Sequence, residues 1–406
     1  MISTTQNLYN QLIEHCFSFM SKPLNKWRKK FITDVLWLFL SIKGHINFSS
    51  LGRYSSYGEQ RFRQQFENDF NFLEFNSALV NRHCSCDKVI AFDPCFIPKS
   101  GKKTPGLGKF WSGCASSIKQ GLEICGIAAI DLENHTAMHL TAVQTMPDKM
   151  TKQLEYYASM LVDRKEELLK ISSTVVADAF FSKKPFVDIL DENGLQLISR
   201  FRDDVRLSYL IKSVKTGKKG RPKTIGKKVN LEQIDENYFT KEKSADDNTR
   251  IYSASVRAVA LKRNVKVVVV FYQTKKNTKA YNVYFSTNTE LTALDILDCY
   301  QSRFQIEFLY RDAKQNTGLN NCQARDENKL NNHFNLSLTA INIAKVVHWF
   351  SIDKDLRKAF SIKDVKTMNH NALLLNRFFT MFGIKPNILK NNHKIKELLL
   401  YGTIAS

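Results

Sequence analysis

Residues Tyr300–Lys314 read YQSRFQIEFLYRDAK, and the spacing within this stretch decides how the rest of the chain is interpreted. Five of its residues share one helical face, within an arc of about 80° at about 100° per residue: Tyr300, Arg303, Glu307, Arg311 and Lys314. One carboxylate framed by Arg and Lys suits a site that holds a metal ion and grips phosphates. The alternative is a solvated surface helix on which Glu307 pairs with Arg303 and Arg311.

The overall charge points to a polyanionic partner. The chain has 406 residues, with 60 Lys and Arg against 39 Asp and Glu, a net charge of +21 and a pI near 9.5. This length allows two or three domains, and such an excess of positive charge favours a nucleic acid as the partner. A merely basic soluble protein is the alternative.

Targeting signals and cysteine spacing predict a soluble, intracellular protein with reduced thiols. The start, MISTTQNLYNQL, lacks a basic segment followed by an apolar run. The longest apolar runs are far shorter than the roughly 20 residues that cross a membrane, so no membrane partner is expected. Eight Cys form no CxxC pair, and HCSC at 83–86 has no second ligand pair at zinc-finger spacing.

Residues 1–85 are predicted to form a helical region that binds DNA. Apolar residues recur at three- and four-residue steps in LYNQLIEHCFSFM, KKFITDVLWLFLSI and EQRFRQQFENDFNFLEFNSALV. Between the second and third of these helices, Arg53, Arg61 and Arg63 lie close in sequence to Tyr54 and Tyr57. This basic, aromatic edge favours contact with a DNA end. A helical bundle with solvated polar faces is the alternative.

From Lys88 the pattern becomes that of an α/β domain with a mixed sheet, expected to span 86–330. KVIAFDP, FWSGCASSI, LEICGIAAIDLE and MHLTAVQT are predicted strands. Residues 148–170 are predicted to form one helix, followed by the strand STVVADAF, the helix SKKPFVDILDENG and the strand LQLISRF. Antiparallel strands followed by alternating helices and strands are typical of this fold class.

Residues 205–285 are predicted to be a β-rich insertion that carries a basic arm. The arm, 212–230, combines Lys and Arg with Gly and has no acid, so it cannot build a core. We expect it to bind phosphates, through Lys218, Lys219, Arg221 and Lys223 in particular. A flexible solvated linker is the alternative. Residues 331–406 are predicted to form a helical C-terminal region.

Three acids are the candidate metal ligands. Asp93 and Asp178 each follow a predicted strand, where the functional acids of such sheets lie, and Glu307 lies on the predicted helix. Three carboxylates without clustered His or Cys suit two Mg²⁺ (or Mn²⁺) ions in phosphodiester chemistry. Alternatively, Asp93 starts a turn and Asp178 caps a helix, and Asp131 is a rival for either place. The Lys-rich stretch PKSGKKTPGLGKF after Asp93 is interpreted as a loop that touches phosphates beside the site.

The spacing Tyr300-x2-Arg303-x3-Glu307-x6-Lys314, with Gln323-Ala-Arg325 beyond it, resembles the Tyr–Arg–Glu–Lys signature of a branch of bacterial insertion-sequence transposases. The resemblance covers roughly residues 86–330 and implies a ribonuclease H-like core of the DDE group. It implies that Asp93, Asp178 and Glu307 hold two metal ions, and that Tyr300, Arg303 and Lys314 contact DNA phosphates. Some members of that branch form a DNA hairpin and use a Trp in the insertion, a segment that has no Trp here; Tyr252 or Tyr272 is the possible substitute.

The sequence therefore predicts a transposase that cleaves double-stranded DNA at terminal inverted repeats and joins the freed 3′-hydroxyl to target DNA. The resemblance also implies a homodimer on DNA and a place in the bacterial cytoplasm, at the nucleoid. One rival is a metal-dependent nuclease on the same core, which hydrolyses DNA without joining it. The other is a catalytically inert DNA-binding protein derived from a transposase.

Overall fold

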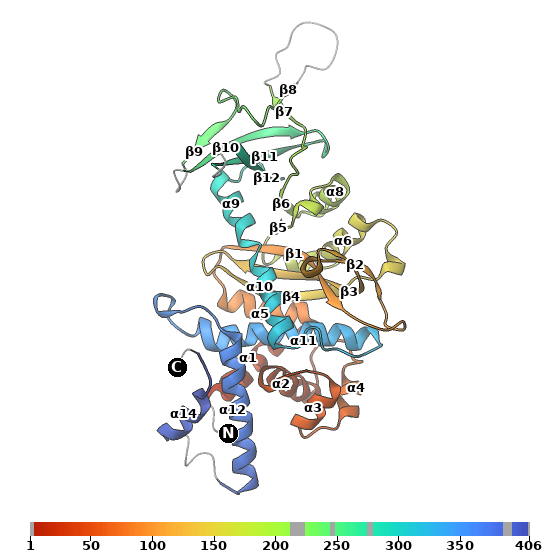
Figure 1. The fold of residues 1–406 in the computed structure, drawn as a ribbon, viewed down its shortest axis with the longest axis vertical. Helices are drawn as coiled ribbons and strands as arrows, with labels where there is room; N and C mark the ends of the chain where they lie inside the picture. Colours follow the sequence, from red (N-terminus) through yellow and green to blue (C-terminus); the bar gives the residue numbers. More distant parts are fainter. Residues whose placement is uncertain (1–3, 212–223, 244–247, 274–278, 385–391, 405–406) are drawn as a thin grey trace.

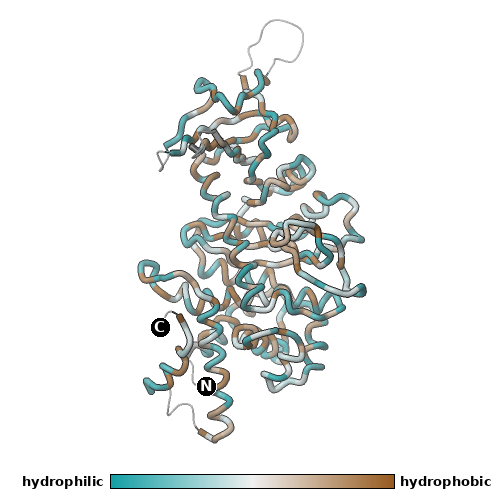
Figure 2. The backbone as a smooth tube through the Cα atoms, viewed as in Figure 1, coloured by the Kyte–Doolittle hydropathy of each residue, from teal (hydrophilic) through white to brown (hydrophobic). Residues whose placement is uncertain are grey.

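The structure is a computed structural model that describes residues 4–211, 224–243, 248–273, 279–384 and 392–404. It is elongated, with three tiers along its long axis (Figure 1). Strands β10–β12 form the upper tier, the strands around β1 the middle tier, and the N- and C-terminal helices the lower tier. Along the tube in Figure 2, apolar residues are frequent in the strands of the middle tier, and polar residues are frequent in the peripheral loops.

The described residues contain one twelve-stranded sheet. Its first six strands are β1 (Lys88–Pro98), β2 (Gly108–Ser112), β3 (Ser117–Asp131), β4 (Thr136–Gln144), β5 (Thr174–Val176) and β6 (Gln196–Arg200). The other six, from the predicted insertion, are β7 (Leu207–Leu210), β8 (Ile225–Lys228), β9 (Thr240–Glu242), β10 (Thr249–Ala258), β11 (Arg263–Gln273) and β12 (Lys279–Ser286). Part of the predicted basic arm, 225–228, is therefore a strand rather than a loop.

The sheet is mixed, as the sequence predicts, and mostly antiparallel. The spatial order is β2-β3-β1-β5-β6-β12-β11-β10-β7-β8, with β4 paired to β3 and β9 to β10. Only β1–β5 and β5–β6 are parallel. The insertion continues the core sheet because β12 pairs with β6, with Ser286 opposite Ile198. This arrangement confirms the predicted mixed α/β fold with a β-rich insertion and is consistent with a ribonuclease H-like core.

Aromatic packing holds the helices that follow β4 against β1. Phe92 on β1 contacts Phe181 and Phe186, with ring centroids 5.2 and 6.2 Å apart, and Tyr157 at 6.3 Å. These side chains come from η3 (Ala179–Phe181), α8 (Lys184–Glu192) and α6 (Gln153–Val162). The single helix predicted over 148–170 is wrong: α6 ends before Asp163 and α7 (Lys165–Leu169) begins after Arg164.

The terminal helices pack together in the lower tier (Figure 1). The N-terminal helices are α1 (Thr4–Ser18), α2 (Lys26–Ser41), α3 (Phe48–Tyr54), α4 (Glu59–Gln65) and α5 (Phe72–His83). The C-terminal helices are α11 (Glu327–Lys345), which continues as a π-turn over Val346–Phe350, α12 (Ile362–Met381) and α14 (His393–Leu400). The helix predicted from 59 to 80 is split, because 66–71 separate α4 from α5. No helix of the described ranges is long and apolar enough to cross a membrane.

Side chains of α11 cover the outer edge of β4. Asn335 accepts a hydrogen bond from the Ala142 N–H (2.8 Å) and donates one to the Ala142 carbonyl (3.0 Å). Asn342, two helical turns further, forms the same pair of bonds with His139 at 2.8 and 2.7 Å. Lys345 donates to the Ala137 carbonyl at 2.8 Å. The helix thus satisfies backbone groups that an edge strand leaves unpaired.

Candidate active site

The pairing of β1 with β5 brings two of the predicted acids to one edge of the sheet. The two parallel strands are aligned with Ala91 opposite Val176. Asp93 and Asp178 each lie two residues beyond that pair, and because side chains alternate along extended backbone they face the same side. Asp93 does not end its strand as predicted: β1 runs on through Pro94 to Pro98, paired with β3.

Arg303 and Glu307 do not share one helix: Arg303 lies in a break between two helices, and Glu307 lies in the first turn of the second. The predicted continuous helix is broken into α9 (Ala293–Ser302) and α10 (Gln305–Asn316). At the break the Ile306 N–H bonds to the Arg303 carbonyl at 3.2 Å, a tighter i→i−3 step than in an α-helix. In Figure 1, α9 and α10 descend in succession from the upper strands past β1 towards α11.

Arg303 links the two carboxylates on β1 and α10. Its Nη1 lies 3.4 Å from Asp93 Oδ1, and its Nη2 lies 2.9 Å from Glu307 Oε1. The Arg303 side chain is 8 % exposed, whereas that of Glu307 is 45 % exposed. Burial alone would lower the pKa of Arg303, but Asp93 and Glu307 raise it above its ordinary value. The expected pair of Glu307 with Arg303 is present, but Arg311 pairs with Asp312 instead (3.5 Å).

Asp93 is the most perturbed carboxyl of this group. Its pKa is raised to about 7, mainly by burial; Arg303 acts to lower it, and the carboxylates of Glu307 and Asp178 act to raise it. Asp178 and Glu307 therefore both lie within electrostatic range of Asp93. A largely buried Asp93 carboxyl with two further acids near it forms a place that stabilises added positive charge.

Tyr310 is a site residue that the sequence analysis missed. Its hydroxyl donates a 2.6 Å hydrogen bond to the backbone carbonyl of Asp93, and its ring is buried. Gly126 on β3 lies opposite Asp93 and makes room for this hydroxyl, because a Cβ there would lie 2.0 Å from it. A glycine inside the buried strand LEICGIAAID was the available signal, since such a residue marks a close approach.

The other predicted phosphate-binding residues lie around this centre at different depths. The Tyr300 ring packs against Tyr284, with ring centroids 4.9 Å apart and the ring planes tilted by 56°, and the Arg303 guanidinium lies 5.9 Å from the Tyr300 centroid. Lys314 donates a 2.9 Å bond to the Phe96 carbonyl on β1. Arg311 points to solvent, 57 % exposed, with its guanidinium 4.8 Å from the ring of Phe308.

The alternatives for the acids are also visible in the structure. The Asp178 side chain caps η3 by accepting a hydrogen bond from the Phe180 N–H at 2.9 Å, and its other oxygen carries no such bond in the described structure. The rival Asp131 lies at the opposite end of β1, paired with Lys88. Its carboxylate accepts four hydrogen bonds from Ser85 and Asn134 and is fully buried. Asp131 therefore has a structural role.

The chemistry of these donors fits a hard cation such as Mg²⁺. Three carboxylates supply oxygen ligands of the kind that Mg²⁺ and Mn²⁺ prefer. Among the described residues no three His, Cys, Asp or Glu side chains converge closely enough to form a metal cluster, because Arg303 lies between Asp93 and Glu307. Asp93, Asp178 and Glu307 are the residues that could hold a metal once the guanidinium moves aside.

Several predicted residues take no part in this centre. Lys218, Lys219, Arg221 and Lys223 fall outside the described residues. Tyr252, a possible substitute for a stacking Trp, is buried and its hydroxyl lies 3.3 Å from Glu236; Tyr272 is 36 % exposed.

Comparison with known proteins agrees with this geometry. A family model described as a transposase DDE domain matches residues 89–343, more than half of the chain, and this range includes Asp93, Asp178 and Glu307. No curated protein matches the chain. The chain therefore belongs to the transposases with a DDE domain, polynucleotidyl transferases that act on DNA and generally use divalent metal ions.

Proposed function

We propose that this protein cleaves double-stranded DNA at the terminal inverted repeats of a bacterial insertion sequence and joins the freed 3′-hydroxyl to target DNA. Asp93, Asp178 and Glu307 are the proposed catalytic carboxylates, with two Mg²⁺ (or Mn²⁺) ions as cofactors. The Tyr–Arg–Glu–Lys spacing supports the assignment to that branch of the family. An enzyme of this branch works at the nucleoid, as a homodimer that holds two DNA ends.

One observation carries the proposal. Asp93 and Asp178 stand two residues beyond the same strand pair, and Glu307 on α10 shares the Arg303 guanidinium with Asp93. Two carboxylates from separate elements thus share one cationic group, and Asp178 is near enough to influence both Asp93 and Arg303 electrostatically. A purely structural ion pair requires only one acid and one base, so the additional acids support a charge-binding role.

The carboxylates, Arg303 and Tyr310 have separate proposed roles in the reaction. When bound, divalent ions neutralise the scissile phosphate and stabilise the attacking and leaving oxygens. The three carboxylates would hold the ions, and Asp93 would be in its ionised form as a ligand. Arg303, freed from the carboxylates, is in position to hold a phosphate oxygen. Tyr310 fixes the backbone of Asp93 through its carbonyl.

The regions around the centre have proposed roles as well. Within the region 1–85, the basic edge around Arg53, Arg61 and Arg63 contacts the transposon end. The catalytic region 86–330 cuts and joins, and the basic arm at 212–230 adds affinity for phosphates. Lys314 and Tyr300 place the DNA backbone beside α10, and Arg311 extends this basic helix face into solvent. The helical region 331–406 supports the core and contributes to the dimer.

The decisive experiment compares the wild type with Glu307→Gln, which keeps the size of the side chain and removes its charge. Each protein is incubated with Mg²⁺ and a duplex that carries the DNA flanking this gene, together with a target plasmid. We expect the wild type to cut at the end boundary and to produce joined plasmid, whereas the variant does neither. Equal cutting by both proteins would show that Glu307 is not in the site.

Two further outcomes identify the rivals. Cutting without any joined product would favour the nuclease. Tight binding of the end duplex without cutting by either protein would favour the inert DNA-binding protein. Glu155→Gln serves as the matched acid control, because that partly exposed carboxylate on α6 pairs with Lys152 and takes no part in the proposed site.

A further inference from the structure

A basic groove lies beyond the carboxylates, where three segments that are distant in sequence meet. It encloses about 840 Å³ between the α2–α3 linker, the loop after β1 and the loop after α10. We call it the β1–α10 groove and define it by six of its lining residues: His45, Lys99, Lys102, Lys103, Asn321 and Arg325. None of the residues that line it is an Asp or a Glu.

The positive charge of the groove is free to meet a ligand. Lys102, Lys103 and Arg325 are exposed, and none of them forms an ion pair within the described ranges. Lys99 is half-buried, and its Nζ donates a 2.6 Å hydrogen bond to the Cys322 carbonyl. Burial lowers the pKa of Lys99, and the nearby Arg325 lowers it too. Crowded cations without an acid favour an anionic partner.

The walls of the groove are fixed by direct contacts. Asn321 accepts a hydrogen bond from the Ile46 N–H at 3.1 Å, and its amide Nδ2 donates to His45 Nδ1 at 3.1 Å. Gly318 has φ +74° and lies so near the α2–α3 linker that a Cβ there would be 2.8 Å from Ile46. The His333 ring lies 2.8 Å from the Gly318 carbonyl. The groove is therefore a preformed surface.

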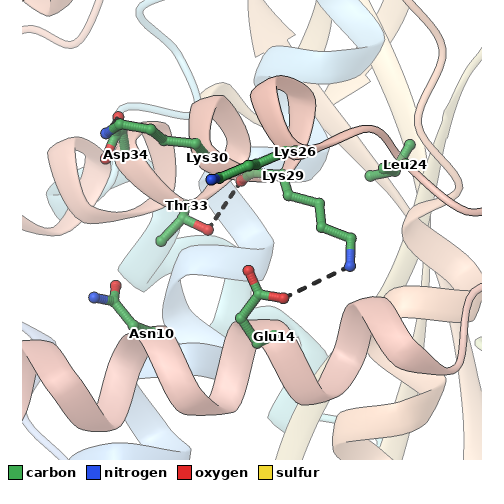
Figure 3. A pocket seen from close by; sticks show the side chains of 8 residues that line it. All are labelled: Asn10, Glu14, Leu24, Lys26, Lys29, Lys30, Thr33 and Asp34. Atoms are coloured by element: carbon green, nitrogen blue, oxygen red, sulfur yellow. Dashed lines mark hydrogen bonds and ion pairs between the residues drawn. The ribbon is translucent and has the colours of Figure 1, made fainter.

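A second groove differs from the β1–α10 groove because most of its lysines are paired with acids. Between α1 and α2, Lys26, Lys29 and Lys30 face Glu14 and Asp34 around a space of about 500 Å³ (Figure 3). Lys29 Nζ lies 3.6 Å from Glu14 Oε2, and Lys30 Nζ lies 2.8 Å from Asp34 Oδ2. Two of its three lysines are already paired, so this groove offers little net charge to a polyanion.

We propose that the β1–α10 groove binds the phosphate backbone of the duplex DNA that continues from the cleavage site. This inference rests on the proposed function for the position of the cut, but the binding surface itself does not depend on catalysis. The groove begins at Pro98, five residues beyond Asp93 on the same strand, which is about 16 Å at the rise of a strand. At 3.4 Å per base pair, this distance corresponds to about five base pairs.

The first test measures binding without cleavage. A fluorescein-labelled 30-base-pair duplex of arbitrary sequence is titrated with the full chain in EDTA at several KCl concentrations, and fluorescence anisotropy gives the dissociation constant. The association constant falls as salt rises, and each lost phosphate contact makes the slope of log K against log salt less steep by about 0.9. We expect the slope of the triple variant Lys102→Gln, Lys103→Gln, Arg325→Gln to be less steep than that of the wild type by about 2–3.

Matched variants separate the groove from net charge. Lys26→Gln, Lys29→Gln, Lys30→Gln removes the same three charges from the balanced groove and is expected to change the slope much less. Lys102→Arg, Lys103→Arg keeps the charge and is expected to keep the slope. Thermal unfolding confirms that each variant is folded. Equal losses of slope in the two triple variants would overturn the proposal.

The second test locates the DNA. Single methylphosphonates, which lack the phosphate charge, are placed along a duplex that carries the gene's flanking end. We expect weaker wild-type binding for substitutions about five base pairs from the cut, and no such effect in the groove variant. A variant that responds like the wild type at every position would overturn the proposal. Failure of Glu307→Gln to block cutting, with the slope result intact, would overturn only the proposed active site.

Discussion

The hydroxyl of Tyr310 occupies the space that a side chain at position 126 would fill, and it bonds to the carbonyl of the residue opposite, Asp93. Gly126 on β3 and Tyr310 on α10 therefore form one contact that sets how closely the helix of Glu307 approaches the strand of Asp93. The distance between two proposed metal ligands depends on a residue that carries no side chain.

Gly126→Ala should force this contact apart. Its Cβ would lie 2.0 Å from the Tyr310 hydroxyl, and overpacking of this kind costs about 1–3 kcal/mol of the free energy of unfolding. Tyr310→Phe alone should cost about 1 kcal/mol, through the lost hydrogen bond. The double variant should be more stable than Gly126→Ala alone, because the clashing oxygen is gone. Urea unfolding measures the stability of the two single variants and the double variant. If the two single losses of free energy simply add in the double variant, this account is contradicted.

Asp93 should make the free energy of unfolding depend on pH. Its pKa is about 7 in the folded chain and near the ordinary aspartate value of 3.8 when unfolded, so the folded state binds the proton more tightly. The free energy of unfolding should therefore fall as pH rises from about 4 to 7, by up to about 4 kcal/mol. Asp93→Asn should lack this component when both proteins are unfolded in EDTA. Parallel pH profiles would show that Asp93 is not perturbed.

Removal of Arg303 should make stability depend on a divalent cation. Arg303→Met leaves the buried Asp93 without its partner, which should cost about 3–5 kcal/mol in EDTA. Because the competing guanidinium is gone, Mg²⁺ should raise the melting temperature of the variant more than that of the wild type. Arg303→Lys is the charge-conserving control. A variant indifferent to Mg²⁺ would argue against a cation site at these carboxylates.

Asn335→Ala should expose the edge of β4. The change leaves the N–H and carbonyl of Ala142 without partners in a buried place, which should cost about 2–4 kcal/mol of the free energy of unfolding. Lys363→Ala, at an exposed position on α12, should stay within about 0.5 kcal/mol of the wild type. Urea unfolding at one pH compares them, and similar losses in both variants would remove the special role of Asn335.

Local patterns predicted the elements of the fold better than their junctions. The apolar run VKVVVVFY marks β11 because continuous apolar residues are typical of a strand that is buried on both faces. The sequence did not predict that β12 would pair with β6 and extend the core sheet, since strand order depends on contacts between distant segments. The break between α9 and α10 was also missed, because 303–304 contain neither Gly nor Pro.

The candidate site was likewise predictable from the sequence only in part. The positions of Asp93 and Asp178 after apolar strands were readable, but their alignment depends on the register of β1 with β5. The position of Arg303 between Asp93 and Glu307 was not predictable, because it requires the crossing of α10 over β1. The spacing around Glu307 placed Arg311 on the same face, yet its side chain turns to Asp312 and solvent.

The pairing of β6 with β12 also has a mechanical consequence. Backbone hydrogen bonds join the upper strands to β6, β6 to β5, and β5 to β1, so a load applied to β10–β12 is carried in shear across the strands that position Asp178 and Asp93. A flexible tether at that junction would let the upper tier swing independently. Instead the continuous hydrogen bonding links the position of β10–β12 to the strands that position the carboxylates.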